Sequence, residues 1–254
     1  MMTGYILKII ASIAMFIDHA GVAFRPLMSY NMYRIMRHIG RMAFPLYAFL
    51  IVEGFHHTKN KKKYLAGMVI FAAISEFPFD ILFNTGDFSW GAGQNVYFTL
   101  SLGLMTVWVC DILYKKVKET QNYWINALIA LVYLAGMGLG DLCVADYASF
   151  GVMLIELYDV FYRIGMSDSF MGRRFEDVRP EKRKMEFAAL ALLIWFAIYD
   201  LSQGHLIEFY GIPAVFLLMA YNGKRGRVPF SKWAFYLYYP VHILLLYWLR
   251  TILV

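Results

Sequence analysis

The feature that most constrains this chain is a series of apolar runs, each near the length that crosses a bilayer. A membrane-spanning α-helix needs about 20 mostly apolar residues. The runs are Tyr5–Phe24, Gly40–Phe55, Tyr64–Phe83, Val96–Tyr114, Tyr123–Leu139, Tyr147–Gly165, Met185–Leu201, Glu208–Tyr221 and Trp233–Leu253. The second and eighth are shorter than the rest, so the number of crossings could lie between eight and ten. We therefore expect an all-α, polytopic integral membrane helix bundle of about nine transmembrane helices.

Composition excludes an ordinary soluble domain. The chain is 60% hydrophobic and 17% charged, whereas a soluble domain usually carries about 25% charged residues. No long polar stretch separates the apolar runs, so we expect one membrane-embedded domain over residues 1–254. The net charge of +6 is spread over short loops without a continuous basic surface, and this argues against a nucleic-acid partner. The first run lacks a basic leader and a cleavage site, so we interpret it as a retained helix.

Lysine and arginine are distributed very unevenly between alternate loops. The loops that contain them are Lys59–Lys63, Lys115–Asn122, Met166–Lys184 and Asn222–Lys232, with four, three, six and four, respectively. The loops that contain none are Asn84–Asn95, Gly140–Asp146 and Ser202–Ile207. Because short loops rich in Lys and Arg stay in the cytoplasm, we expect a multi-pass cell-membrane protein with a cytoplasmic N-terminus and a C-terminus outside.

One segment departs from this charge rule. Arg25, Arg34 and Arg37 fall on the expected outer side, and Arg41 lies just inside the second run. Arg34, Arg37 and Arg41 have the spacing i, i+3, i+7, which places them on one helical face. Two interpretations are open at this stage. The segment is either an interfacial amphipathic turn or a group of arginines that faces an anionic ligand inside the protein.

Many ionisable residues lie inside the apolar runs. Such residues are costly in lipid, and they usually face a cavity or one another. They are Lys8, Asp18, His19, Arg41, Glu53, Glu76, Asp80, Glu156, Asp159, Asp200 and His242. Those near helix ends, such as Lys8 and Glu53, can extend to the interface. Part of this set is therefore expected to be structural.

The first run places a lysine and a histidine on one face. Lys8 and His19 are eleven residues apart, which is about three turns and about 16 Å along the helix axis. Ser12 and Met15 share that face. Asp18 points about 100° away from His19, so we expect it to contact a neighbouring helix rather than the imidazole.

Histidines and carboxylates near prolines are the other polar groups of interest. His242 follows Pro240, and Glu76 and Asp80 flank Pro78, where a helix loses one backbone hydrogen bond. A histidine at membrane depth can be a base, a proton relay, a metal ligand or a packed neutral residue. No second His or Cys follows His19 at i+3 or i+4, so no metal is expected. Asp159 and Arg163 are spaced for a structural ion pair.

Motifs along almost the whole chain resemble the TraX family of integral membrane proteins. They are Leu7–Ala11, Ile17–Gly21, Ile39–Phe49, Val52–Phe55, Ser75–Asp80, Gln94–Leu100, Asp146–Tyr147, Gly151–Val152 and Lys232–His242. The family includes a pilin acetylase linked to conjugation, and it is grouped with membrane acyltransferases that use acyl-CoA. In the related membrane O-acyltransferases a basic residue precedes an essential histidine by ten intervening residues. Lys8 and His19 have this spacing.

The resemblance implies acyl transfer from acetyl-CoA, with His19 as a catalytic base or an acyl carrier. The acceptor would be an amine or a hydroxyl at the outer face, on a pilin-like peptide or a cell-surface glycan. Further catalytic candidates are Glu76, Asp80 and Asp18, of which Glu76 or Asp80 could orient the imidazole. Candidates for phosphate or oxyanion contacts are Lys8, Arg37 and Arg41, and those for substrate contacts are Asn95, His242 and Tyr239.

Two other functions fit the same residues. Intramembrane carboxylates and histidines also serve proton relays, so a proton-coupled transporter is the first alternative. The second is a non-enzymatic assembly protein, in which all buried charges would pair with one another and no pocket would surround His19.

Overall fold

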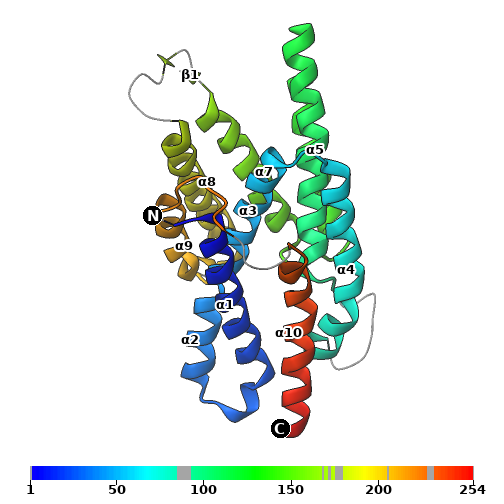
Figure 1. The fold of residues 1–254 in the computed structure, drawn as a ribbon, viewed down its shortest axis with the longest axis vertical. Coiled ribbons are helices and arrows are strands. Elements are labelled where there is room, and N and C mark those ends of the chain that lie inside the picture. Colours follow the sequence, from blue (N-terminus) through cyan, green and yellow to red (C-terminus); the bar gives the residue numbers. More distant parts are fainter. Residues whose placement is uncertain are drawn as a thin grey trace. The chain divides into compact units, whose positions relative to one another are not determined.

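The computed structural model describes residues 2–84, 93–167, 169–170, 173–174, 180–204, 206–227 and 232–253 (Figure 1). Within these ranges the chain is helical apart from turns and one hairpin of two-residue strands. The α-helices are α1 Gly4–Ala23, α2 Tyr30–Gly40, α3 Ala43–His57, α4 Lys61–Phe83, α5 Val96–Thr120, α6 Ile125–Leu142, α7 Ala148–Met166, α8 Pro180–Gln203, α9 Pro213–Met219 and α10 Lys232–Leu253. The shorter elements are the 3-10 turns η1 Arg25–Leu27 and η2 Glu208–Gly211 and the antiparallel strands β1 Ser169–Phe170 and β2 Arg173–Arg174.

Six helical segments in the described ranges are long and apolar enough to cross a membrane. They are α1, the continuous segment Tyr30–His57, α4, α5, α6 and α8. Helices α7 and α10 have 19 and 22 residues but do not meet the same standard of apolarity and charge. The chain is therefore a multi-pass membrane protein, as expected, and the number of nine crossings stays a prediction.

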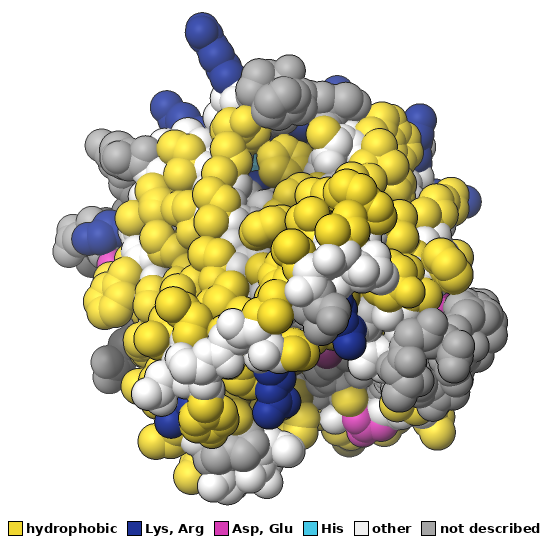
Figure 2. Space-filling view, turned by 90° about the horizontal axis from the view of Figure 1, so that it is seen from below, with side chains coloured by type: hydrophobic (Ala, Val, Ile, Leu, Met, Phe, Trp, Pro, Cys, Tyr) yellow, Lys and Arg dark blue, Asp and Glu magenta, His cyan; other side chains and the backbone are white. Residues whose placement is uncertain are grey.

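The surface is apolar enough to face lipid. Helix α6 buries only 17% of its apolar window inside the molecule, and it leaves Leu131 and Leu134 more than half exposed. Figure 2 shows a face on which hydrophobic side chains prevail and Lys and Arg are scattered. Soluble monomers rarely expose contiguous apolar patches of this kind, because water penalises them.

The second crossing differs from the expectation. The sequence predicts it at Gly40–Phe55, with Arg34 and Arg37 before it on the outer side, but residues 30–40 already form helix α2. Ser29 caps this helix by accepting a hydrogen bond from the amide of Met32. The 28-residue segment Tyr30–His57 is interrupted only at the junction of α2 and α3. Apolar length did not show this start, because Arg34 and Arg37 lower the hydropathy of residues 30–40.

The chain divides into two compact units, each described here by itself. Unit 1 comprises Met1–Leu50 and Leu157–Val254, and unit 2 comprises Ile51–Glu156. Helices α3 and α7 run through the boundaries between them. Whether the two units act as the single domain expected from the sequence stays a prediction.

In unit 2 the loops meet as the charge pattern predicts. Lys61 and Lys115 both bond Oδ2 of Asp111, at 2.5 and 2.8 Å, so the two basic loops lie at one end. At the other end the amide of Gln94 donates to the carbonyl of Val144 at 2.9 Å. The two loops without Lys or Arg therefore meet there, and α4, α5 and α6 alternate in direction.

In unit 1 the N-terminal segment lies against a basic loop. The amides of Gly4 and Tyr5 donate to the carbonyls of Lys224 and Arg225, at 2.9 and 3.0 Å. Helices α1 and α2 then form an antiparallel pair, with Gly21 close to Met36. The expected eighth crossing, Glu208–Tyr221, is the 3-10 turn η2 followed by the seven-residue helix α9. It is the shortest apolar helical segment that the structure describes in this unit.

Candidate active site

The lysine and histidine face of α1 lies against α10, as helical spacing predicts. The Lys8 ammonium sits 5.4 Å from the centroid of the Phe235 ring, near the N-terminal end of both helices. Three turns further along α1, His19 meets His242 of α10. The shared face of α1 is therefore confirmed, and its partner is the last helix of the chain.

The two histidines form a directly hydrogen-bonded pair. Nδ1 of His19 lies 2.8 Å from Nε2 of His242, and the two rings are nearly parallel, at 12°. Nδ1 of His242 turns back along its own helix to the carbonyl oxygen of Tyr238, at 2.7 Å. Pro240 lies between these two residues in α10. The pair is thus anchored to the backbone of α10.

This chain of hydrogen bonds determines which nitrogen of His19 can react. A carbonyl oxygen only accepts, so Nδ1 of His242 must carry a hydrogen. In the neutral ring the lone pair of His242 is then on Nε2, which accepts a hydrogen bond from Nδ1 of His19. Neutral His19 consequently carries its lone pair on Nε2, the nitrogen that points away from the pair. An imidazole nitrogen with a lone pair can take a proton or attack a carbonyl carbon.

Aromatic rings hold this pair in place. Tyr238 stacks on His242 with a centroid distance of 4.7 Å, and its hydroxyl donates to the Ser12 carbonyl at 2.9 Å. Tyr239 meets both imidazoles edge-on, at 6.0 and 5.7 Å. His242 and Tyr239 are buried, whereas His19 is partly exposed. Of the two histidines, His19 is therefore the more exposed.

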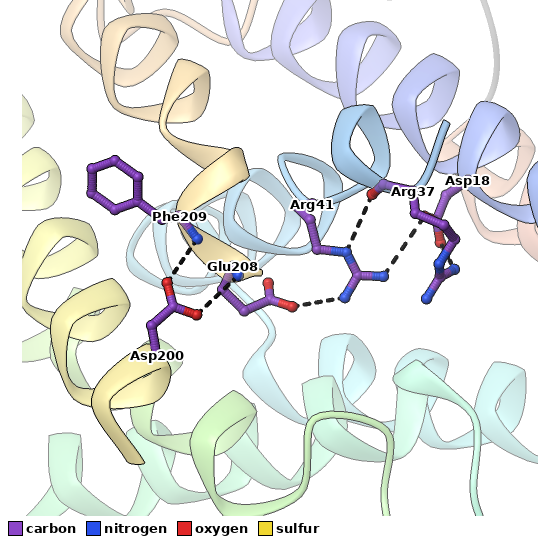
Figure 3. Close-up of polar contacts among 6 residues, drawn as sticks. All are labelled: Asp18, Arg37, Arg41, Asp200, Glu208 and Phe209. Carbon is purple, nitrogen blue, oxygen red and sulfur yellow. Dashed lines mark hydrogen bonds and ion pairs between the residues drawn. The ribbon is translucent and has the colours of Figure 1, made fainter. Parts of the chain in front are cut away.

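A chain of charged groups begins on the adjacent face of α1 (Figure 3). Asp18 accepts from Nη1 of Arg37 at 2.5 Å, which confirms that its side chain contacts a neighbouring helix. Nη2 of Arg41 lies 3.7 Å from the same carboxylate, and its Nη1 lies 2.7 Å from Glu208. Asp200 accepts from the backbone amides of Glu208 and Phe209, at 3.0 and 2.9 Å. The chain thus joins α1, α2, η2 and α8.

Arg41 stabilises the interruption between α2 and α3. Its Nε donates to the carbonyl of Arg37 at 3.3 Å, one of the carbonyls that the end of α2 leaves without a helical partner. A Cβ at Gly40 would overlap the Asp18 side chain, so only glycine lets the two helices approach this closely. Both guanidiniums also lie within electrostatic range of the His19 ring.

Comparison with known proteins bears on this site. The family model described as "TraX protein" matches residues 3–250. The chain belongs to the TraX family. A relative from Dichelobacter nodosus, described as "Probable fimbrial assembly protein FimC, serogroup H1", is 29% identical over 252 residues, which cover 94% of this chain and 92% of the relative. No solved structure matches.

The carboxylates of the TraX motif Ser75–Asp80 lie in unit 2. Oε2 of Glu76 accepts from the backbone amide of Asn95 at 3.2 Å and also from its side-chain amide. Oδ1 of Asp80 accepts from the side-chain amide of Asn84 at 2.8 Å. The described hydrogen-bond partner of His19 is His242, so the orienting role expected for Glu76 or Asp80 stays a prediction.

Asn95 is fully engaged in local structure. Its Oδ1 caps α5 by accepting from the amide of Tyr97 at 3.0 Å, and its Nδ2 donates to the carbonyl of Ala72 at 2.8 Å. Together with the Glu76 contact, these bonds fasten the start of α5 to α4. The substrate contact expected for Asn95, like the one expected for Tyr239, stays a prediction.

Two residues of the candidate site are not indicated by the sequence. Glu208, the buried partner of Arg41, only begins an apolar run there, and Tyr238, whose carbonyl accepts from His242, lies in the motif Lys232–His242 without a predicted role. The structure places His242 against His19, and the substrate contact expected for His242 stays a prediction. The ion pair between Asp159 and Arg163, at 2.9 Å, is confirmed.

Proposed function

We propose that this protein is a membrane acyltransferase that moves an acyl group from acyl-CoA to an amine or hydroxyl, with His19 as the reacting base. The single observation that carries the proposal is the geometry of His19. It is a partly exposed histidine on a membrane helix, and its hydrogen bond to His242 leaves the lone pair on Nε2. Membership of the TraX family supports this chemistry, since the resemblance implies acyl transfer.

The proposed step transfers one proton in each direction. Nε2 of His19 takes the proton of the acceptor amine or hydroxyl as that nitrogen or oxygen attacks the thioester carbonyl. The tetrahedral intermediate then expels the thiolate of CoA, which takes the proton back from Nε2. While the imidazole is charged, Nδ1–H still donates to His242, so the ring keeps its orientation.

Arg37 is the better of the two arginines for an anionic contact. Its side chain is 30% exposed, whereas that of Arg41 is 13% exposed and faces two carboxylates. A guanidinium has five N–H donors, so Arg37 can bind Asp18 and also face a developing oxyanion or a CoA phosphate. This role for Arg37, with Lys8 as a further phosphate contact, is part of the proposal.

The relative's printed name suggests the class of acceptor. The relative is described as a probable fimbrial assembly protein, so we propose a pilin-like polypeptide as the acceptor for this chain. Acetyl-CoA is the proposed donor, entering from the cytoplasm. The orientation that the loop charges predict, with the N-terminus inside, places His19 toward the outer end of α1.

Inverted membrane vesicles supplied with radiolabelled acetyl-CoA test the proposal. His19→Ala should reduce both label transfer and free CoA release by about 10²–10⁴-fold, the usual contribution of a general base. His57→Ala is the matched control, because this exposed histidine lies in unit 2 and pairs only with Glu53 among the contacts described. Undiminished transfer by folded His19→Ala would remove His19 from the mechanism, and the absence of any label transfer by the native protein would remove the enzyme assignment. Uptake of a solute by the same vesicles, driven by a proton gradient, would instead favour the alternative of a proton-coupled transporter.

A further inference from the structure

The segment that breaks the loop-charge rule has an unusual surface. Residues 24–35, here called the α1–α2 tip, contain two arginines and no acidic residue. The guanidinium of Arg25 lies 4.8 Å from the Tyr33 ring, and that of Arg34 lies 5.7 Å from the Tyr30 ring. Among the residues that the structure describes, neither guanidinium forms an ion pair with a carboxylate.

Exposed apolar side chains lie beside these arginines. Leu27 is 57% exposed and Tyr30 is 66% exposed, and Met32 and Ile35 are also more than half exposed. Water alone would favour the arginines but not four exposed apolar side chains in one short segment. A soluble anionic peptide would leave the same apolar groups in water.

A phospholipid fits both the arginines and the exposed apolar side chains, because its headgroup can bind the arginines while its acyl chains cover the apolar groups. Arginine binds phosphate through two parallel N–H bonds, and tyrosines collect at the membrane interface because their rings are apolar and their hydroxyls polar. Basic helices with an apolar face bind anionic bilayers through these same two contributions. We propose that the α1–α2 tip is a binding site for anionic phospholipid headgroups, with Arg25 and Arg34 on the phosphates.

The site would also set the depth of His19 in the bilayer. His19 precedes the end of α1 at Ala23 by four residues, which corresponds to about 6 Å along the helix. Phosphates held at the tip would therefore lie about one helical turn beyond the imidazole. This inference does not depend on acyl transfer, since it concerns lipid alone.

Native mass spectrometry of the full chain, released from nanodiscs of mixed phosphatidylglycerol and phosphatidylcholine, measures the lipid that stays bound. Each arginine near an anionic surface contributes about 1 kcal/mol, or about fivefold in affinity. The double variant R25Q/R34Q should therefore retain phosphatidylglycerol about 25-fold less strongly. R25K/R34K, which keeps the charges, should lose less than the glutamine variant.

The control is K116Q/K118Q, which removes two exposed lysines near the end of α5. Unchanged retention in R25Q/R34Q, or an equal loss in the control, would overturn the proposal. Normal lipid retention with impaired label transfer would also overturn it, because the arginines would then contact an anionic acceptor. If the double variant does not fold, the two single variants are each expected to show the fivefold loss.

Discussion

Each unit contains a polar pair next to a proline in a helix, and the two pairs differ in how far their side chains are exposed. In unit 1, His19 bonds to His242 near Pro240 and stays partly exposed. In unit 2, Glu76 bonds to Asn95 near Pro78, and both side chains are almost completely buried, at 1% and 0% exposed. The first pair is therefore the more exposed of the two.

Under the proposed function, this difference separates a reactive polar group from a structural one. The Asn95 side chain and amide donate to one carboxylate oxygen and thereby fix a helix start. The histidine pair uses one nitrogen of each ring for the anchor, and the remaining nitrogen of His19 keeps its lone pair. The presence of a polar residue in a membrane helix therefore does not by itself indicate function; its hydrogen bonds and its exposure must also fit the proposed chemistry.

The largest effect should come from breaking the anchor in unit 1. In His242→Ala, His19 loses the acceptor that orients it, and kcat for label transfer should fall by about 10- to 100-fold. Steady-state kinetics should show KM for acetyl-CoA within about twofold, because His242 is a positioning residue. His242→Gln, whose amide oxygen can accept from Nδ1 of His19, should recover part of the loss.

His38→Ala serves as the control for this variant. His38 lies in unit 1 and stacks on Tyr210, with the two ring centroids 3.5 Å apart. It is not part of the His19–His242 pair. An equal loss of kcat in both variants would indicate general damage to unit 1. Full activity of His242→Ala would show that the tautomer of His19 is fixed in another way.

Glu76→Gln should have a smaller effect, on stability rather than on chemistry. The amide oxygen of glutamine can still accept from Asn95, but a charged acceptor is lost, so the free energy of unfolding should fall by about 1–2 kcal/mol. Unfolding by SDS titration in mixed micelles measures this change. The rate of label transfer per folded molecule should stay within about twofold of the native rate.

A large loss of kcat in folded Glu76→Gln would erase the contrast between the two pairs. It would return Glu76 to the orienting role that its position in the Ser75–Asp80 motif first indicated. Asn95→Asp offers the complementary test, because it places a second carboxylate beside Glu76 and should destabilise the protein more than Glu76→Gln.

Much of the architecture could be predicted from sequence, because lipid imposes simple rules. Apolar length located α1, α7 and α10 to within one residue at each end, and loop charge predicted which loops of unit 2 meet. Helical arithmetic also placed Lys8 and His19 on one face. The start of α2 was missed, since Arg34 and Arg37 lower the apparent hydropathy of residues 30–40, although the charge of Arg37 is neutralised by Asp18 in the folded chain.

The site itself was only half predictable. His19 was identified from its spacing to Lys8, but its partner lies 223 residues away, and no local pattern encodes a contact of that range. The structure shows Asn95 as a helix cap, a role that an asparagine before Val96 and Tyr97 also allows, and its expected substrate contact stays a prediction. Local rules thus find helix starts and faces, whereas pairings between distant helices depend on tertiary packing.

The smallest expected effect tests whether exposure to solvent also determines how much a simple ion pair stabilises the protein. Lys61 and Lys115 bond the same oxygen of Asp111, but their side chains are 24% and 64% exposed, respectively. Exposed ion pairs contribute little, since water screens them and ordering a long side chain costs entropy. Lys115→Gln should therefore lower the free energy of unfolding by less than about 0.5 kcal/mol, and Lys61→Gln by about 1 kcal/mol. SDS titration of both variants compares them directly. A larger effect at Lys115 would mean that this end of unit 2 lies in a less polar environment than its exposure implies, as it would beneath lipid headgroups.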